Sequence, residues 1–237
     1  MCTATWRTTA DGYVLYFNRD ESRSRQAAAP PRRIDRGGMP LLAPADGDFG
    51  GTWIATNATG LTVALLNRYQ DHAKAGPGPF ISRGLLVLDL AEATDWLDLD
   101  ARLDVLDFNQ YRPFTLLVVE AQGEAFRAAW DGRRRLPNDR PEPPMASSGY
   151  DPEGIEALRH QIFAEFPAEG TEALHDFHRS HRPDRGPFSP CMHRFDASTV
   201  SLTRVEVHGG RITMAYADGP PCRTSLGPTV VLPRGLN

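Results

Sequence analysis

Residues 2–20 read CTATWRTTADGYVLYFNRD, and this N-terminal stretch decides the architecture of the first strands. Residues 3–9 are rich in Thr and Trp, and residues 13–17 form the apolar run Tyr-Val-Leu-Tyr-Phe. Both compositions favour β-strands, and the intervening Ala-Asp-Gly at residues 10–12 is typical of a tight turn. The sequence therefore predicts a β-hairpin, with residues 18–20 following the second strand directly.

Further strand pairs follow along the chain, each interrupted by a short polar or glycine-containing turn. We expect hairpins at residues 52–57 with 61–67, at 114–120 with 125–130, and at 199–208 with 211–217. Residues 19–51 are different, because Arg, Ala, Pro, Asp and Gly dominate and no hydrophobic period is sustained. We expect a long surface loop there, with Arg32, Arg33 and Arg36 forming a basic cluster that is solvated or faces an anionic ligand.

Helices are expected between these strand pairs. The apolar runs within residues 81–106 are interspersed with acidic residues and favour two short helices. Asp151 and Pro152 are typical of an N-cap and a first helical position, and apolar residues then recur on one helical face. The members of that face are Ile155, Leu158, Ile162, Phe163 and Phe166. A further helix is predicted over residues 172–180.

Strand pairs separated by blocks of helices favour an α+β fold, in which helices cover the outer faces of antiparallel sheets. Alternating βαβ units are not seen, and Gly37-Gly38 and Gly50-Gly51 lack the strand-before, helix-after context of a phosphate-binding loop. The length of 237 residues fits one domain, so we expect a single unit over residues 1–237.

Composition excludes several classes of function. The 26 Lys and Arg residues against 30 Asp and Glu give a net charge of −4, which argues against nucleic-acid binding. The sequence has no apolar run of transmembrane length and no signal-peptide pattern, so we expect a cytoplasmic protein without a membrane partner. Cys2, Cys191 and Cys222 show neither a disulfide framework nor paired metal spacing, and no metal or cofactor is expected.

Cys2 is the first candidate catalytic residue. If the initiator Met1 is removed, the thiol and a free α-amine belong to the same residue. The amine, with an ordinary pKa of about 7.7 to 8.0, can then accept the thiol proton. An incidental cysteine in an edge strand is the alternative interpretation.

Polar residues after the predicted strands supply partners for Cys2. In the N-terminal hairpin Asp20 lies just past the residue opposite Cys2, so its carboxylate can approach the freed amine. Arg19 can pair with Asp20 or with a substrate carboxylate, and Asn18 can donate and accept hydrogen bonds. Asn67 ends an apolar strand and is placed to donate to an oxyanion. The alternative for the residues around Asp20 is a polar loop with a solvated ion pair, and the alternative for Asn67 is a turn cap.

Other polar residues carry weaker signals. Ser147 and Ser148 follow a Pro-rich run and precede the helix at Asp151, which favours a turn or cap. His193 is close to Cys191 and Arg194, but two ligand types in one short segment are too sparse to predict a metal site. A thiol-redox role for Cys2 lacks a resolving cysteine nearby.

Several of these residues together resemble the NRDE family, also called the transport and Golgi organisation protein 2 family. The resemblance rests on Met1-Cys2, Asn18-Arg19-Asp20-Glu21 with Arg25, Asp46 or Asp48 before Gly50-Gly51-Thr52-Trp53, and Gly60 to Asn67. It is sharp over about the first 70 residues. It implies a relationship to N-terminal-nucleophile hydrolases, and hence a four-layer αββα sandwich.

The N-terminal half is also similar to choloylglycine hydrolases and penicillin V acylases. In this resemblance Cys2 corresponds to the nucleophile of those enzymes, Asp20 to their aspartate and Asn67 to their oxyanion-hole asparagine. Two positions depart from those hydrolases: Phe17 replaces an arginine and Ser147 replaces an asparagine. The active-site arginine near the C-terminal end of those enzymes has no clear counterpart here, although His193 and Arg194 lie in the comparable region. The resemblance implies hydrolysis or acyl transfer on a small amide or thioester. The alternative is a non-catalytic ligand-binding or trafficking protein that handles haem or acyl-CoA. The sequence does not indicate an oligomeric state.

Overall fold

Two antiparallel sheets lie face to face in the computed structural model, which describes residues 2–76 and 78–235. The six-stranded sheet has the order β10 (Met145–Ser147), β1 (Cys2–Thr9), β2 (Gly12–Ser22), β11 (Ala197–His208), β12 (Arg211–Ala217) and β13 (Val230–Pro233). The seven-stranded sheet follows chain order, with β3 (Ala29–Arg36), β4 (Met39–Ala45), β5 (Ile54–Asn57), β6 (Thr62–Asn67), β7 (Phe114–Val119), β8 (Ala125–Trp130) and β9 (Arg135–Asp139).

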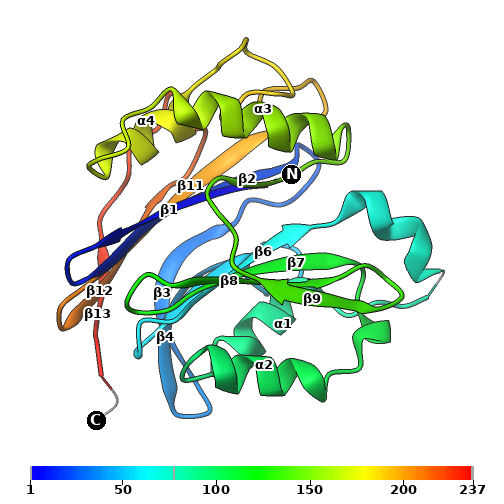
Figure 1. Ribbon diagram of the computed structural model, residues 1–237, viewed down its shortest axis with the longest axis vertical. Helices are drawn as coiled ribbons and strands as arrows, with labels where there is room; N and C mark the ends of the chain where they lie inside the picture. Colours follow the sequence, from blue (N-terminus) through cyan, green and yellow to red (C-terminus); the bar gives the residue numbers. More distant parts are fainter. Residues whose placement is uncertain (1, 77, 236–237) are drawn as a thin grey trace.

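Helices cover the outer face of each sheet (Figure 1). Helices α3 (Pro152–Ala164) and α4 (Glu172–Arg179) lie over the six-stranded sheet, and α1 (Arg83–Leu90) and α2 (Trp96–Asp104) lie under the seven-stranded one. Two short 3-10 helices, η1 (Tyr69–Ala75) and η2 (Phe108–Gln110), complete the described elements. The predicted α+β class and four-layer αββα sandwich are confirmed.

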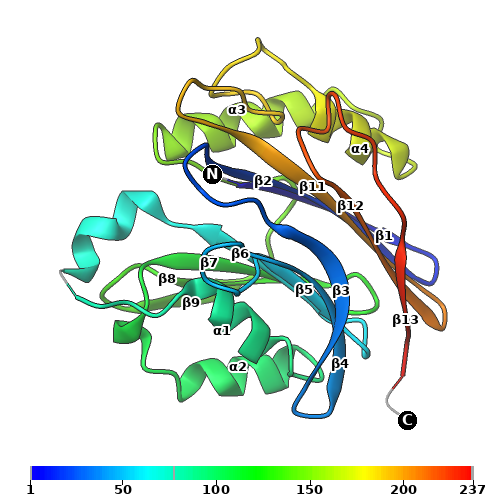
Figure 2. The same ribbon diagram turned by 180° about the vertical axis from the view of Figure 1, so that it is seen from behind.

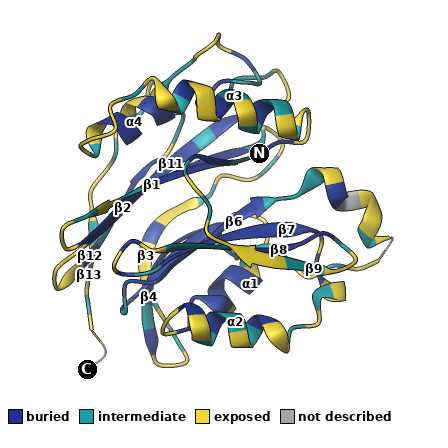
Figure 3. Ribbon diagram, in the orientation of Figure 1, coloured by how far each residue is buried: buried dark blue, intermediate teal, exposed yellow. Residues whose placement is uncertain are grey.

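The alternating side chains of β2 show why the chain folds into layers. Tyr13, Leu15 and Phe17 enter the core between the two sheets, whereas Val14 and Tyr16 pack toward α4. Successive side chains of a strand point to opposite faces, so a strand that is apolar throughout is buried on both faces. Figure 3 shows this burial as dark ribbons in both sheets, with the exposed residues of the helices on the outside.

The predicted hairpins and helices are largely confirmed. The first hairpin pairs Cys2 with Arg19, so Asp20 lies one residue beyond the partner of Cys2. Asp151 caps α3 by accepting a hydrogen bond from the Gly154 amide, with Pro152 in the first turn. On α3, however, the fully buried residues include Arg159 beside Ile155, and Leu158 is only half-buried.

The predicted loop over residues 19–51 is wrong, because it contains the hairpin of β3 and β4. Gly37 and Gly38 connect the two strands with φ values of 58° and 83°, and positive φ at both central residues is typical of a type I′ turn. The prolines and arginines conceal β3 in the sequence, and Pro30 and Pro31 are tolerated because they lie in an outer strand, at a break in the β3–β4 register between Ala29 and Arg32. Figure 2 shows β3 beside β13 on the side where the two sheets converge.

The three arginines that were expected to form a basic cluster in that segment have different surroundings. Arg36 pairs with Asp89 and with Glu92 of the α1 region, whereas Arg32 and Arg33 are exposed on β3. The short strands β10 and β13 were also missed, since each offers few residues to a periodic pattern. Within residues 2–76 and 78–235, no helix has the length and apolar character to cross a membrane.

Asn57 provides a test of how the seven-stranded sheet holds its helix layer. Its buried side chain donates from Nδ2 to the Ala91 and Ala93 carbonyls and accepts at Oδ1 from the Thr59 and Leu61 amides. Asn57→Ala should lower the free energy of unfolding by about 2 to 4 kcal/mol, because buried backbone groups lose their partners. Urea denaturation measures this; the exposed Asn109→Ala should change little, and equal effects of the two would contradict the assignment.

Candidate active site

A cavity of about 410 Å³ opens where the start of β1 and the end of β2 meet the end of β6. Both sheets contribute to its wall, as do the segments before β5 and around α1. Its lining includes Cys2, Arg19, Asp20, Glu21, Arg25, Asp46, Trp53, Asn67, Tyr69, Arg83 and Arg112. Four of the five predicted site residues therefore share one cavity, and the volume suits a small ligand.

Cys2 is held at its backbone from both neighbouring strands. It is the first residue of β1, it is opposite Arg19 of β2 and Ser147 of β10, and its amide N–H donates to Ser147 Oγ at 3.0 Å. The predicted turn at Ser147 is thus corrected to a strand residue, while Ser148 does accept hydrogen bonds from the Tyr150 and Asp151 amides. The predicted removal of Met1 concerns a residue outside the described part of the chain.

The surroundings of the Cys2 thiol favour its neutral form. Cys2 is 7% exposed, and burial raises the pKa of its thiol. The negative charge of Asp20 also raises the pKa, whereas a hydrogen bond from the Asp20 backbone lowers it. A thiol in this setting becomes a nucleophile when a nearby base takes its proton.

The carboxylate of Asp20 is buried beneath Cys2. Thr199 Oγ1 donates to Asp20 Oδ1 at 2.6 Å and accepts a hydrogen bond from the Met192 amide at 2.8 Å. A break in the β2–β11 register directly after Thr199 accompanies this arrangement. Burial raises the pKa of Asp20, and the charge of Arg159 and the Thr199 hydrogen bond lower it.

Arg159 is a buried charged residue beside the candidate site that the sequence analysis did not single out. It projects from α3 toward the six-stranded sheet, is fully buried, and donates to Thr3 Oγ1 and to the Ser189 and Phe188 carbonyls. Burial lowers its pKa, and the negative charges of Asp20 and Cys2 raise it. The sequence signal was present, because Arg159 follows Ile155 by four residues and so shares the apolar face of the helix.

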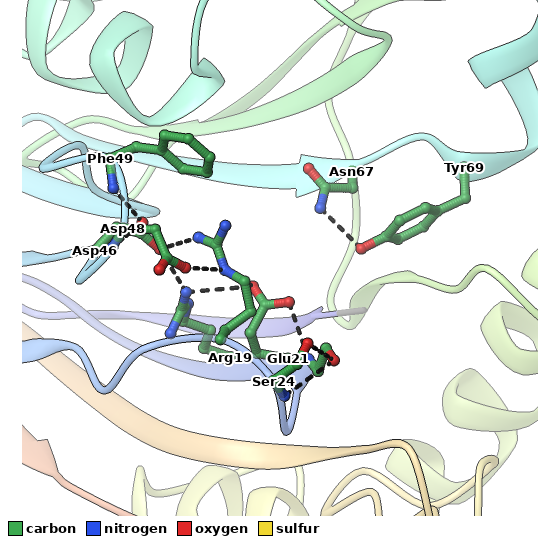
Figure 4. Close-up of polar contacts among 10 residues, drawn as sticks. Arg19, Glu21, Ser24, Asp46, Asp48, Phe49, Asn67 and Tyr69 are labelled. Atoms are coloured by element: carbon green, nitrogen blue, oxygen red, sulfur yellow. Dashed lines mark hydrogen bonds and ion pairs between the residues drawn. The ribbon is translucent and has the colours of Figure 1, made fainter.

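Arg19 forms part of an ion-pair network along one wall (Figure 4). Its Nη2 lies 2.6 Å from Asp46 Oδ2 and 3.2 Å from Glu21 Oε2, and its guanidinium lies 4.4 Å from the centroid of the Trp53 ring. Arg25 contacts the same Asp46 oxygen, also at 2.6 Å. The predicted pairing of Arg19 with Asp20 is therefore replaced by pairing with Asp46 and Glu21.

Asn67 and Tyr69 lie on the opposite side of the cavity from this network (Figure 4). Asn67 Nδ2 donates to Tyr69 Oη at 2.9 Å, and Asn67 is half-buried at the end of β6. A primary amide carries a second N–H, so this hydrogen bond leaves Asn67 a donor for a ligand. The geometry is compatible with the predicted oxyanion role.

Asn18 occupies a different place from the other predicted site residues. Its Nδ2 donates to the His178 and Pro190 carbonyls, both at 2.9 Å, and it does not line the cavity. It joins β2 to the helix layer, so we assign it no part in the chemistry. Phe17 is buried between the sheets, and His193 and Arg194 also lie outside the cavity lining.

Comparisons with known proteins concern the family and the fold of the chain. The sequence profile of the family described as Transport and Golgi organisation 2 matches residues 1–143. No curated protein matches the chain significantly by sequence. A mutant conjugated bile acid hydrolase from Clostridium perfringens superposes with a TM-score of 0.56 and 11% identity, covering 98% of this chain and 92% of that chain. A second variant of that hydrolase superposes with a TM-score of 0.56 and 10% identity, covering 99% of this chain and 98% of that chain. These likenesses show that the chain shares the fold of that hydrolase.

The electrostatic coupling between Arg159 and Asp20 can be measured by a double-mutant cycle. Arg159→Met should lower the free energy of unfolding by about 3 to 5 kcal/mol at pH 7, because it leaves a buried carboxylate without its cation. The pKa of Asp20 should rise further, so protonation relieves the loss and the destabilisation should shrink toward pH 4.

Adding Asp20→Asn to Arg159→Met should recover part of the stability at pH 7, and chemical denaturation of the four proteins measures the coupling. The exposed Arg33→Met should change the free energy of unfolding by less than about 0.5 kcal/mol. Strict additivity of Asp20→Asn and Arg159→Met would show that the two groups do not interact.

Proposed function

The chain belongs to the Transport and Golgi organisation 2 family, and from this premise we propose that it acts as an N-terminal cysteine nucleophile on a small amide or thioester. The reaction is hydrolysis or transfer of the acyl group. The observation that carries the proposal is the placement of Cys2 at a cavity wall, with Asp20 beneath it and Asn67 in the same cavity.

The proposed base is the α-amine that Cys2 acquires when the peptide bond before it is cleaved. The Cys2 nitrogen already donates to Ser147 Oγ, so Ser147 can hold the amine in place. A neutral amine near its ordinary pKa can take the thiol proton at neutral pH. The buried charge of Asp20 stabilises the resulting ammonium ion.

The acyl group then passes through a thioester with Cys2. The thiolate attacks the substrate carbonyl carbon, and the second N–H of Asn67 donates to the developing oxyanion. The ammonium returns its proton to the leaving amine or thiol as the tetrahedral intermediate collapses. Water, or another acceptor, attacks the thioester with the amine again acting as base, and the free thiol is restored.

Two arginines that line the cavity indicate the chemistry of the substrate. Arg83 and Arg112 both line it, and Arg112 lies 4.7 Å from the centroid of the Phe80 ring. Burial lowers the pKa of Arg83 and the charge of Arg112 lowers it too, whereas Tyr69 and Glu21 raise it. Two cations that repel one another are stabilised by an anion between them, so we propose a substrate with a carboxylate or phosphate group.

Alkylation tests the nucleophile directly. Chain that begins at Cys2 should react with iodoacetamide at Cys2 at least about tenfold faster at pH 7 than chain that keeps a residue before it, because only the former has the adjacent amine. In the chain with a preceding residue, burial raises the thiol pKa and labelling should accelerate only at alkaline pH. Intact mass with peptide mapping measures both. Equal rates would contradict the amine as base.

Turnover separates the roles of Cys2 and Asn67. In a screen of neutral and anionic amides and thioesters, Cys2→Ala should abolish product formation, and Asn67→Ala should lower kcat about 100-fold or more with a smaller change in KM. The exposed Asn109→Ala, which is outside the cavity lining, serves as the matched control. Unchanged turnover in Cys2→Ala contradicts the mechanism, whereas saturable ligand binding without product would support the alternative of a ligand-binding protein.

A further inference from the structure

A second group of side chains with metal-binding atoms lies outside the candidate active site. It is a cluster formed by His181, Cys191, His193 and Cys222. One ligand atom from each lies within 4.8 Å of all the others. None belongs to the cavity described above. The sequence did not indicate this cluster, because only Cys191 and His193 are close in the chain, while Cys222 follows β12.

Two distances within the cluster, from His193 to each cysteine, match the sulfur–nitrogen edges of a tetrahedral metal site. His193 Nε2 lies 3.6 Å from Cys191 Sγ and 3.5 Å from Cys222 Sγ. With Zn–S bonds of about 2.3 Å and Zn–N bonds of about 2.0 to 2.1 Å, a tetrahedron has S···N edges of about 3.6 Å. The ring centroids of His181 and His193 lie 5.0 Å apart with an interplanar angle of 66°, so the two rings meet edge to face rather than in a parallel stack.

His181 supplies a second, independent indication of a ligand. Its Nε2 atom is buried and makes no hydrogen bond within the described part of the chain. A buried polar nitrogen without a partner is costly, and a metal ion satisfies it. Cys191 is fully buried, and both cysteines are free rather than joined in a disulfide.

We propose that His181, Cys191, His193 and Cys222 bind one zinc ion in a structural site. Two thiolates and two imidazoles are the donor set of closed, four-coordinate zinc sites. No carboxylate joins the cluster among the described residues, which disfavours magnesium, calcium and manganese. With four protein ligands the ion has no open position for a substrate, so the site stabilises structure and takes no part in the acyl chemistry.

The location of the cluster explains what the ion stabilises. Residues 180–196 contain neither helix nor strand, apart from a bridge between His193 and Ser198, yet they include buried residues that hold the active site. The Phe188 and Ser189 carbonyls accept hydrogen bonds from Arg159, and the Met192 amide donates to Thr199. Zinc would fasten this irregular segment to the one that carries Cys222.

Figure 2 shows the segment after β12 rising toward the helix layer of α3 and α4, where residues 180–196 also run. The two segments come from different parts of the chain, and the described contacts between them include the Cys222 and His193 pair. A metal ion that joins distant segments constrains the unfolded chain and is lost on unfolding, so it contributes directly to stability.

Metal analysis of the full chain, purified under reducing conditions without a histidine tag, tests the proposal. Elemental analysis should find about one zinc per chain. After zinc is removed, titration with Co²⁺ should give the strong visible absorption of tetrahedral cobalt and a thiolate charge-transfer band, saturating at one equivalent. Removal of zinc should lower Tm by about 5 to 10 °C, because a ligand that binds only the folded state stabilises it.

Variants identify the ligands. The double variant Cys191→Ser and Cys222→Ser should lose the zinc and the charge-transfer band, whereas Cys2→Ala and the exposed His160→Asn should keep both. The cobalt spectrum of the unmodified chain does not depend on whether the double variant folds. Substoichiometric zinc, an octahedral cobalt spectrum, full zinc in the double variant, or a mass lighter by two hydrogens from a Cys191–Cys222 disulfide would each overturn the proposal.

Discussion

The buried carboxylate of Asp20 is the constraint on which the rest of the site depends. Removing an ion from water costs several kcal/mol, so the surrounding chain has to compensate the charge. Thr199 does so through a direct hydrogen bond, and Arg159 does so as a fully buried cation from the helix layer. Arg159 in turn needs acceptors, which it finds in the backbone carbonyls of residues 188 and 189.

This series of contacts passes through every layer on one side of the molecule. It begins at Cys2 on the inner face of the six-stranded sheet, crosses the sheet at Asp20, and ends in the irregular segment beyond α4. Asn67, by contrast, comes from the other sheet. The relative position of Cys2 and Asn67 is therefore set by the apolar core between the sheets, in which Phe17 and Leu66 are buried.

The sequence predicted most of this fold because its strands and helices have strong local signals. Turn residues and apolar runs indicated the hairpins, and the spacing in the first hairpin placed Asp20 next to Cys2. Prediction failed where tertiary context decides the outcome. The prolines and arginines of β3 conceal a strand that forms through its pairing with β4, and Ser147 belongs to a strand of three residues that forms through its pairing with β1.

The candidate site shows the same division. Cys2 and Asp20 could be paired from local spacing, since a hairpin register relates them. Arg159 could not be assigned from periodicity alone, because a charged residue on an apolar helix face has no partner until the helix is docked on its sheet. Asn18 shows the reverse: strand alternation directs it to the helix layer, where it binds backbone carbonyls instead of facing the cavity.

The composition of β3 has a consequence for how the protein behaves at high concentration. An outer strand presents unpaired backbone groups to which a strand of another molecule can add. Pro30 and Pro31 have no N–H to offer, and Arg32 and Arg33 place charge along the same edge. Two molecules that meet there repel each other and lack the donors for a continuous ladder, so this edge protects the sandwich from fibrillar stacking.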